Sequence, residues 1–336
     1  MVDTVTLKGW VEEDGRHLSA GDVGRLLEAG PSAVGRFGGE FLLMWNDCMA
    51  RDHFGIIPGP CPAGSVYCTG REAGTVSPDP PAFDLHDAIA EAVRLRSDEG
   101  VTALSGGVDS SLIAALAGLP CVAVGLPGSH DLERAAYVAE KLGLTLHAVE
   151  LTPAMISAAL LAVVLVIPDK NPVDASIAAT QYCIASWAAE HGYSRILAGQ
   201  GADELFGGYA RYLESADIAG DLAKDFRGLA GQCARDQAVA GLHGTSFSLP
   251  YLDIRVVRAA RALPPAAMVE GGVRKRPLRR VAEREVPADI ARYEKKAMQY
   301  GSGVWKVIRQ LARENGYKKS VQGYINQIGE TAHDGI

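Results

Sequence analysis

The sequence predicts an α/β protein in which a parallel sheet carries helices on both faces, with a small β-rich part before it and a helical part after it. Between residues 101 and 199, short apolar runs alternate with helical patterns over short connections. Residues 1–80 contain strand-like runs among many glycines and prolines, and helical patterns dominate from residue 209 onward. The Pro-rich stretch 77–84 is typical of a linker, so we expect one domain at 1–80 and a second at 81–336.

Short strands and one helix are expected before the linker. The runs VTLKGWV (5–11), EFLLMW (40–45) and SVYC (65–68) are rich in β-branched and aromatic residues, which favour strands. AGDVGRLLEAG (20–30) is typical of a short helix. After the linker, residues 84–99 space their apolar side chains as an amphipathic helix does.

The central part alternates strands and helices in the order that builds a parallel sheet. We expect strands at 101–104, 121–126, 144–151 and 195–199, and helices at 110–118, 131–143 and 174–191. A sheet of this kind binds ligands in the loops at the carboxyl ends of its strands. Functional residues are therefore expected directly after these strands.

Composition and charge exclude several classes of protein. The 336 residues include 33 Lys and Arg against 40 Asp and Glu, a net charge of −7, so a basic nucleic-acid-binding surface is not expected. VRKRPLRR (273–280) is a basic patch, but a short one. The longest apolar run, residues 155–167, is too short to span a bilayer and predicts a buried helix.

The cysteines give no sign of a metal site. Six occur in the chain, and none forms a C-x-x-C pair of the kind that binds zinc. Most of them lie in apolar or helical surroundings, which favours free thiols in a reducing, cytoplasmic compartment. VDTVTLKGW after Met1 has no signal-peptide pattern, and we expect the weakly patterned last stretch, 315–336, to fray.

The stretch SGGVDSS (105–111) follows an expected strand and opens an expected helix, which is the position of a phosphate loop. Gly106 and Gly107 let the backbone approach an anion, and the first amides of the helix carry partial positive charge. The serines can donate hydrogen bonds, whereas Asp109 suits a phosphate site only with Mg²⁺ between the two anions. The Walker lysine is absent. The structural alternative is a serine-capped helix after a tight turn.

SGGxDSS resembles the phosphate loop of pyrophosphatase-type (PP-loop) enzymes, which split ATP into AMP and pyrophosphate. Residues 123–143, 197–212 and 248–264 are similar to the synthetase domain of glutamine-dependent asparagine synthetases. Together the matches cover most of residues 85–310, in the order of that family. The resemblance implies an adenine nucleotide alpha hydrolase-like fold. It also implies that ATP and Mg²⁺ activate a carboxylate as an acyl-adenylate, from which ammonia or another amine displaces AMP.

The resemblance further implies roles for individual residues. Nucleotide binding falls to residues at the strand ends: Leu104, Ser105, Gly106, Gly107, Asp109, Ser110, Val124, Ala198 and Gly199. Asp109 and Asp203 would bind Mg²⁺, although the loop around Asp203 is also compatible with a plain glycine-rich helix start. Lys296 and Lys275 would stabilise charge on the reacting phosphate and carbon. Lys295 is adjacent to Lys296, and spacing alone does not separate the two; any of these lysines is otherwise an ordinary surface residue.

The N-terminal part departs from the family pattern. The family's glutaminase domain begins with a nucleophilic cysteine, whereas this chain begins Met1-Val2-Asp3. Residues 36–47 and 50–59 nevertheless resemble the closing strands of that domain. We therefore expect 1–80 to be a degenerate glutaminase-like (Ntn-type) remnant that has lost its reaction.

Two positions near the expected active site also differ. Gln200 stands at the catalytic position where the family has a glutamate, and an amide cannot act as a base at neutral pH. Ala178 stands near the family's substrate-binding arginine, which disfavours free aspartate as the substrate. Asp174 is either an acidic contact for an amine or an ordinary helix N-cap.

Three functions remain open on these grounds. The first is an ATP-dependent carbon–nitrogen ligase that takes ATP and a small carboxylate, with ammonia or an amine as the donor, supplied in one version by a separate glutaminase. The second is a PP-loop enzyme that adenylates a nucleobase carbonyl in RNA, which the acidic charge disfavours. The third is a nucleotide-binding subunit without catalysis. No membrane partner is expected, and a homodimer is left open.

Overall fold

The structure is a computed structural model, and it describes residues 5–294 and 298–333. The chain forms two compact units that interleave along the sequence. Unit 1 comprises Met1–Asp98, Gln200–Ala234 and Ser248–Pro277, and unit 2 comprises Glu99–Gly199, Arg235–Phe247 and Leu278–Ile336. Unit 1 groups the N-terminal part with segments far along the chain and so is not the same division as the expected one at residue 80. The domain boundary at residue 80 stays a prediction.

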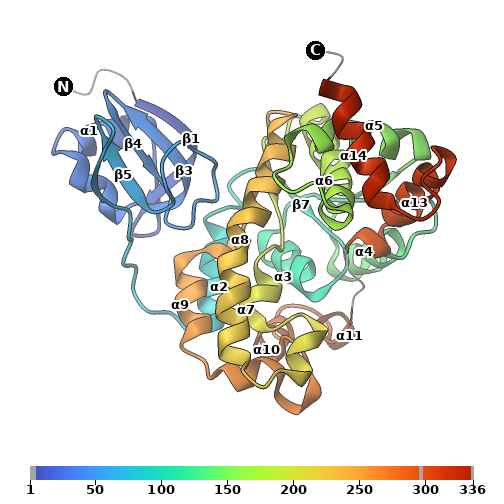
Figure 1. Ribbon diagram of the computed structural model, residues 1–336. Helices are drawn as coiled ribbons and strands as arrows, with labels where there is room; N and C mark the ends of the chain where they lie inside the picture. Colours follow the sequence, from blue (N-terminus) through green and yellow to red (C-terminus); the bar gives the residue numbers. More distant parts are fainter. Residues whose placement is uncertain (1–4, 295–297, 334–336) are drawn as a thin grey trace. The chain divides into compact units, whose positions relative to one another are not determined.

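An antiparallel sheet of six strands forms the N-terminal part of unit 1, drawn in blue in Figure 1. Its strands, in the order β2-β1-β3-β4-β5-β6, are β1 (Val5–Glu13), β2 (Arg16–Leu18), β3 (Gly38–Trp45), β4 (Cys48–Arg51), β5 (Ser65–Cys68) and β6 (Arg71–Thr75). Helix α1 (Ala20–Leu27) begins at a capping box between Ser19 and Asp22. It buries Val23 and Leu27 in the same core as Phe41, so the helix closes one face of the sheet.

The rest of unit 1 is helical. It contains α2 (Leu85–Arg94), α7 (Ala202–Phe206), α9 (Ile254–Arg261) and short 3-10 helices at Ala210–Glu214, Pro250–Leu252 and Pro265–Gly272; a further 3-10 helix, Pro31–Arg36, lies in the N-terminal part. Helix α2 packs against α9. The amphipathic helix expected at 84–99 is thus confirmed, with Asp84 as its N-cap. Helices α8 (Ile218–Gly241) and α10 (Arg276–Ala282) each contribute residues to both units.

Unit 2 contains the predicted parallel sheet. Its order is β11-β10-β7-β8-β9, from β7 (Val101–Ala103), β8 (Cys121–Gly125), β9 (Leu146–Glu150), β10 (Arg195–Leu197) and β11 (Ser246–Ser248). The pairs β10–β7, β7–β8 and β8–β9 are parallel. The sequence had not suggested β11, which extends the sheet at one edge.

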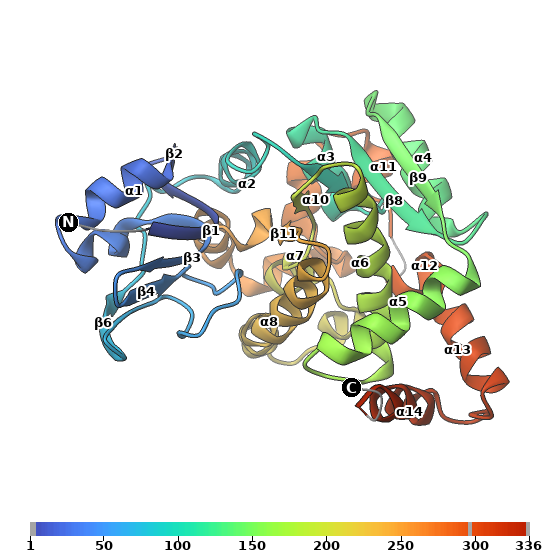
Figure 2. The same cartoon turned by 90° about the horizontal axis from the view of Figure 1, so that it is seen from above.

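Helices cover both faces of this sheet. Helices α3 (Val108–Ala117), α4 (His130–Leu142) and α6 (Pro172–Glu190) pack on its strands. Unit 2 also contains α5 (Pro153–Val166), α11 (Ala288–Ala291), α12 (Met298–Gly301), α13 (Val304–Glu314) and α14 (Val321–His333), which pack on other helices of the unit. Helices α3 and α4 connect strands in one direction along the sheet, and α6 returns in the other. Right-handed crossovers therefore put α6 on the face opposite α3 and α4, as Figure 2 allows the reader to follow. The predicted fold class is confirmed.

Two helices differ from expectation. Helix α5 is not buried all round, because Met155, Leu161 and Leu165 on one of its faces are 41%, 50% and 46% exposed. The last stretch forms α14 and packs on α5 and α13, so the expectation that it frays was wrong for the residues described up to 333. Within the described ranges, no helix has both the length and the apolar character needed to cross a membrane.

A disulfide joins Cys48 on β4 to Cys68 on β5. The two residues are direct cross-strand neighbours in the antiparallel pair. We expected free thiols, and the structure has four, all buried: Cys61, Cys121, Cys183 and Cys233. Sequence spacing did not identify the bonded pair because its twenty-residue separation has no zinc or redox motif. Since disulfides are rare in reducing compartments, this pair weakens the argument from cysteine usage for a cytoplasmic location.

A buried carboxyl at the end of β4 makes the stability of the N-terminal part depend on pH. Asp52 is 1% exposed and accepts hydrogen bonds from the backbone amides of Ile56 and Ile57 at 2.9 and 3.0 Å. Burial raises its pKa from 3.8 to about 6. A raised acid pKa adds stability that is fully present below pH 3.8 and is lost as the pH rises through 6.

We therefore expect the free energy of unfolding of the unmodified protein, relative to Asp52→Asn, to fall by about 3 kcal/mol between pH 3.5 and pH 7.5. Urea unfolding of both proteins across this pH range measures the difference. Asn keeps the size of the side chain but does not titrate. A difference that stays constant, or grows with pH, would show that the backbone amides outweigh burial.

Candidate nucleotide and acyl-transfer site

The loop between β7 and α3 has the backbone geometry of an anion cradle. Gly106 has a φ of +72°, which residues with a side chain rarely adopt. Gly107 is the N-cap of α3, and no side chain of the described residues caps this helix. The positive end of the ten-residue helix therefore faces the loop. The serine-capped helix considered from the sequence is not what forms here.

Serine side chains form hydrogen bonds within the loop. The Ser110 Oγ accepts a hydrogen bond from the Ser105 amide at 3.1 Å and lies 2.9 Å from the Ser105 Oγ. It also donates to the Gly107 carbonyl at 3.3 Å. The Ser111 Oγ is buried without a hydrogen-bond partner among the described residues. Ser110 thus shapes the loop, and its predicted contact with phosphate stays a prediction.

The end of β10 meets the start of α3. A Cβ at Gly199 would lie 3.1 Å from the Asp109 Cβ and 3.5 Å from the Ser110 amide nitrogen. The side chains of Leu104, Val124 and Ala198 are buried, and contact between a nucleotide and the backbone at these strand ends stays a prediction. Unit 2 therefore brings together all the residues predicted for nucleotide binding, at the carboxyl ends of β7, β8 and β10.

The stretch after the predicted catalytic lysines also lies at this edge of the sheet. The Leu126 amide, just past β8, donates to the Ser302 carbonyl at 2.9 Å. Helix α12 packs against α4 and α6. Lys295 and Lys296 lie outside the described residues, so the choice between them and their position stay predictions.

The second predicted lysine is placed in unit 1 beside the predicted metal ligand. The Lys275 Nζ lies 2.8 Å from the Asp203 Oδ1, and the lysine is 7% exposed. Lys275 also has a φ of +56°, an uncommon backbone conformation for a residue other than glycine. Such outliers persist where the surroundings hold them, and they cluster at functional sites.

Gly208 makes room for this ion pair. A Cβ at Gly208 would lie 1.7 Å from the Asp203 Oδ1 and 2.3 Å from the Lys275 Cε. Its amide also donates to the Asp203 carbonyl at 2.9 Å. Glycine is therefore required at this position for Asp203 and Lys275 to meet. Sequence reasoning missed this role, although the GG pair in ELFGGY was a visible signal.

Glu204 is a further residue that sequence reasoning did not single out. It is 3% exposed and accepts hydrogen bonds from the Tyr209 hydroxyl at 2.5 Å and the Gln232 amide at 2.7 Å. Burial raises the pKa of its carboxyl above the usual value. The family resemblance implied a metal-binding role only for its sequence neighbour, Asp203.

Asp109 belongs to unit 2 and Asp203 to unit 1, so their joint coordination of Mg²⁺ stays a prediction. In the part of the chain that the structure describes, one group of acidic and histidine side chains has metal-ligand spacing. It consists of Asp84, His86 and Asp87 at the exposed start of α2. Neither predicted ligand belongs to it.

Helix α6 carries the two positions, Asp174 and Ala178, that the sequence associated with the substrate, and both are engaged in contacts within the protein. Asn171 is its N-cap, and Asp174 forms an ion pair with Arg235 and accepts a hydrogen bond from the Asn171 Nδ2 at 2.6 Å. Asp174 is therefore not the N-cap of α6; its carboxylate is ion-paired with Arg235, and a contact with an amine stays a prediction. Ala178 is fully buried in the helix packing.

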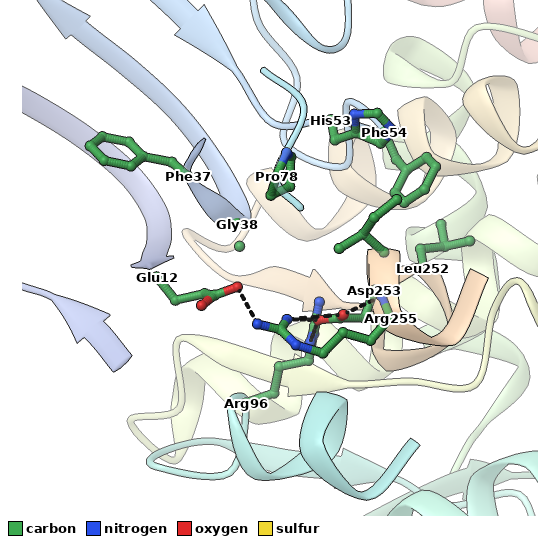
Figure 3. A pocket seen from close by; sticks show the side chains of 12 residues that line it. Glu12, Phe37, Gly38, His53, Phe54, Pro78, Arg96, Leu252, Asp253 and Arg255 are labelled. Carbon is green, nitrogen blue, oxygen red and sulfur yellow. Dashed lines mark hydrogen bonds and ion pairs between the residues drawn. The ribbon is translucent and has the colours of Figure 1, made fainter. Parts of the chain in front are cut away.

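Unit 1 contains a small pocket whose charged lining is paired internally (Figure 3). Arg255 lies 2.8 Å from Glu12 and 3.2 Å from Asp253, and Arg96 lies 3.0 Å from Asp253. Arg96 also bonds Glu40 at 2.8 Å. Breaking such a buried pair leaves an uncompensated charge. The network therefore secures the N-terminal sheet to α2 and α9.

Comparison with known proteins agrees with this architecture. The family model for asparagine synthase matches residues 84–227 and 223–327. The chain is 31% identical over 288 residues to a putative glutamine-hydrolysing asparagine synthetase of Methanocaldococcus jannaschii, covering 73% of this chain and 53% of that protein. It is 30% identical over 250 residues to asparagine synthetase B of Escherichia coli, covering 66% and 45% respectively.

A nodule asparagine synthetase of Pisum sativum is 28% identical over 299 residues, which cover 75% of this chain and 50% of the plant protein. The chain thus spans about half the length of the curated relatives that it matches. The matched residues include the phosphate loop, the Asp203 loop and Lys275. On this match, the chain belongs to the asparagine synthase family.

Proposed function

We propose that the protein is an ATP-dependent amide-forming ligase. It attaches AMP to a carboxylate with release of pyrophosphate, and an amine then attacks the acyl-adenylate and displaces AMP. The observation that carries the proposal is the uncapped α3 behind Gly106 and Gly107, with the Gly199 backbone against its first turn. This arrangement offers backbone amides and a helix dipole to phosphate groups, because no side chain of the described residues caps the helix.

Two carboxylates are suited to hold Mg²⁺ on the pyrophosphate portion of ATP. The Asp203 side chain remains 42% exposed while its Oδ1 contacts Lys275, so the carboxylate is accessible to a cation. Asp109 lies on the first turn of α3, where an anion facing phosphate requires a cation between them. When bound, Mg²⁺ would neutralise charge on the leaving pyrophosphate. Lys275 would stabilise charge that develops on the reacting groups.

Two residues, Ala178 and Gln200, bear on which carboxylate and which amine the protein would use. Ala178 is buried and apolar, so no guanidinium is offered at that point of α6 to an α-carboxylate. The Gln200 amide cannot remove a proton from the incoming amine. We expect a substrate other than free aspartate, and an amine that is free ammonia, ammonia from a separate glutaminase or an amino group of the substrate. The 1–80 part would contribute no glutaminase activity.

ATP–pyrophosphate exchange across a library of small carboxylates tests the proposal. Exchange with at least one carboxylate, followed by AMP formation when an amine is added, is expected. Asp109→Asn should abolish exchange without unfolding the protein. ATP binding without exchange for any carboxylate would favour a nucleotide-binding subunit instead. Amide formation with glutamine as the sole donor, and no partner protein, would contradict the absence of a glutaminase.

A further inference from the structure

Helix α7 carries two neighbouring acids, Asp203 and Glu204, in different surroundings. The Asp203 side chain is 42% exposed, whereas Glu204 is 3% exposed. The helix has only five residues, and a helix of this length is not stable on its own. Contacts with other parts of unit 1 must therefore decide where its two carboxylates lie.

Glu204 connects this short helix to two other segments of unit 1. Its Oε1 accepts hydrogen bonds from the Tyr209 hydroxyl at 2.5 Å and from the Gln232 Nε2 at 2.7 Å. Gln232 lies on the long helix α8, in the part of it that belongs to unit 1. Hydrogen bonds to a carboxylate are shorter and stronger than those between neutral groups, so these two contacts are suited to fix α7.

A turn of two glycines, Gly207 and Gly208, separates Glu204 from Tyr209. Gly207 has a φ of +69° at the end of α7, and the Gly208 amide donates to the Asp203 carbonyl at 2.9 Å. Because glycine adopts many backbone conformations, a turn of this composition has little stiffness of its own. The hydrogen bond from Tyr209 back to Glu204 closes the turn.

The same turn contacts the stretch that carries Lys275. The Gly208 carbonyl accepts a hydrogen bond from the Arg274 Nη1 at 2.9 Å. The Lys275 Nζ lies 2.8 Å from the Asp203 Oδ1. A Cβ at Gly208 would lie within 2.3 Å of both members of this ion pair. A shift of the turn would therefore move Asp203 relative to Lys275.

Further contacts in unit 1 hold the ring of Tyr209. The Arg211 Cζ lies 4.3 Å from its ring centroid, a cation–π contact, and the Tyr212 ring stacks on it at 5.9 Å. Arg211 forms an ion pair with Asp225 on α8 at 2.5 Å, and the Tyr212 hydroxyl donates to the same carboxylate. The ring is thus fixed independently of the hydroxyl that reaches Glu204.

We infer that Glu204 and Tyr209 are positioning residues whose hydrogen bond closes the two-glycine turn and so holds Asp203 against Lys275. Where it concerns the reaction, this inference rests on the proposed ligase function. Neither side chain needs to touch ATP. Loosening their bond separates the Lys275 ammonium from Asp203, so it should slow adenylate formation more than it weakens ATP binding.

The kinetic test measures ATP–pyrophosphate exchange in variants of the two residues. Tyr209→Phe keeps the ring and its contacts but loses the bond to Glu204, and we expect kcat to fall about tenfold with KM for ATP within about twofold. Glu204→Ala removes both hydrogen bonds and should lower kcat at least as far. Glu204→Gln keeps an acceptor oxygen for both donors, so its kcat should fall only about two- to threefold.

Tyr212→Phe is the matched control. It also removes a tyrosine hydroxyl from a carboxylate, that of Asp225, and it keeps the ring that stacks on Tyr209. Its hydrogen bond does not close the two-glycine turn, so we expect a comparable loss of thermal stability with kcat within about twofold. An equal fall of kcat in Tyr209→Phe and Tyr212→Phe, or an unchanged kcat in Tyr209→Phe, overturns the inference.

A second readout needs neither ATP nor a carboxylate. Formaldehyde and cyanoborohydride methylate accessible lysine amines, and mass spectrometry gives the rate at Lys275 relative to Lys224, which is exposed on α8. Lys275 is 7% exposed, so we expect slow methylation in the unmodified protein and in Tyr212→Phe. We expect severalfold faster methylation in Tyr209→Phe. Gly208→Ala, whose methyl group would separate the ion pair, is the positive control.

The two readouts fail in different ways. Absence of exchange with every carboxylate, together with faster methylation of Lys275 in Tyr209→Phe but not in Tyr212→Phe, would refute the ligase function and leave the positioning intact. Exchange by the unmodified protein, together with unchanged methylation in Tyr209→Phe, would refute the positioning and leave the ligase function intact. Circular dichroism and thermal unfolding confirm that each variant is folded; should Glu204→Ala fail to fold, Tyr209→Phe and Glu204→Gln decide.

Discussion

Replacing Gly106 with alanine is expected to weaken ATP binding about 10- to 100-fold. A φ of +72° costs a residue with a Cβ roughly 1–2 kcal/mol. The new methyl group would also lie 2.5 Å from the Arg134 Cγ and 2.8 Å from its carbonyl carbon. The backbone of α4 cannot yield as a flexible side-chain end would, so the loop must move and its amides no longer face the phosphates. Isothermal titration with Mg²⁺·ATP measures the loss.

Gly118 offers a control on the same helix. It has a φ of +61° at the C-cap of α3, and no atom of the described residues lies within 4 Å of where its Cβ would be. Gly118→Ala therefore has the same type of backbone strain without the clash. We expect a modest loss of thermal stability and unchanged ATP affinity. Equal losses of affinity in both variants would show that backbone strain alone, and not contact with Arg134, shapes the loop.

Replacing Lys275 with methionine is expected to lower kcat for ATP–pyrophosphate exchange by about 10²–10³-fold, with whichever carboxylate supports exchange. The change removes the ammonium but keeps the length of the side chain. Position 275 has a φ of +56° in either case, so the backbone strain is the same. Lys275 is buried and held 2.8 Å from Asp203, so it is a fixed charge whose loss solvent does not compensate. Stability should change little, because the Asp203 side chain that loses its partner is 42% exposed.

Two further variants test whether catalysis requires the contact between Lys275 and Asp203 or only the lysine. Gly208→Ala would put a methyl group 1.7 Å from the Asp203 Oδ1, and we expect it to separate the pair and lower kcat nearly as far as Lys275→Met. Lys224→Met, at an exposed position of α8, should leave exchange unchanged. Full activity of Gly208→Ala would mean that Lys275 acts without Asp203. Full activity of Lys275→Met would remove the lysine from the mechanism.

Much of unit 2 could be predicted because its signals are local. Strand–helix alternation from 101 to 199 depends on apolar periodicity within each segment, and it identified β7, α3, β8, α4, β9, α6 and β10 in order. The stretch SGGVDSS also predicts its own local backbone geometry, because Gly106 can adopt the positive φ of a turn between a strand and a helix. Each pattern is complete within a few residues, so the sequence alone sufficed.

The contacts that could not be predicted join residues far apart in the chain. Asp203 and Lys275 are 72 positions apart (275 − 203), and Tyr293 and His130 are 163 apart. The Cys48–Cys68 bond depends on the register of β4 and β5, and the exposure of Leu161 on α5 depends on which neighbours pack there. No local pattern encodes such pairings.

The sequence by itself determined the order of the central elements, the phosphate loop and the family. Only the tertiary structure decided that Gly106 lies against Arg134, that Gly208 makes room for Asp203 and Lys275, and that Ser110 supports the loop from within. The physical reason is that secondary structure follows from the conformational preferences of neighbouring residues. The placement of a charge follows from the path of the whole chain, which brings distant side chains together in a low-dielectric interior.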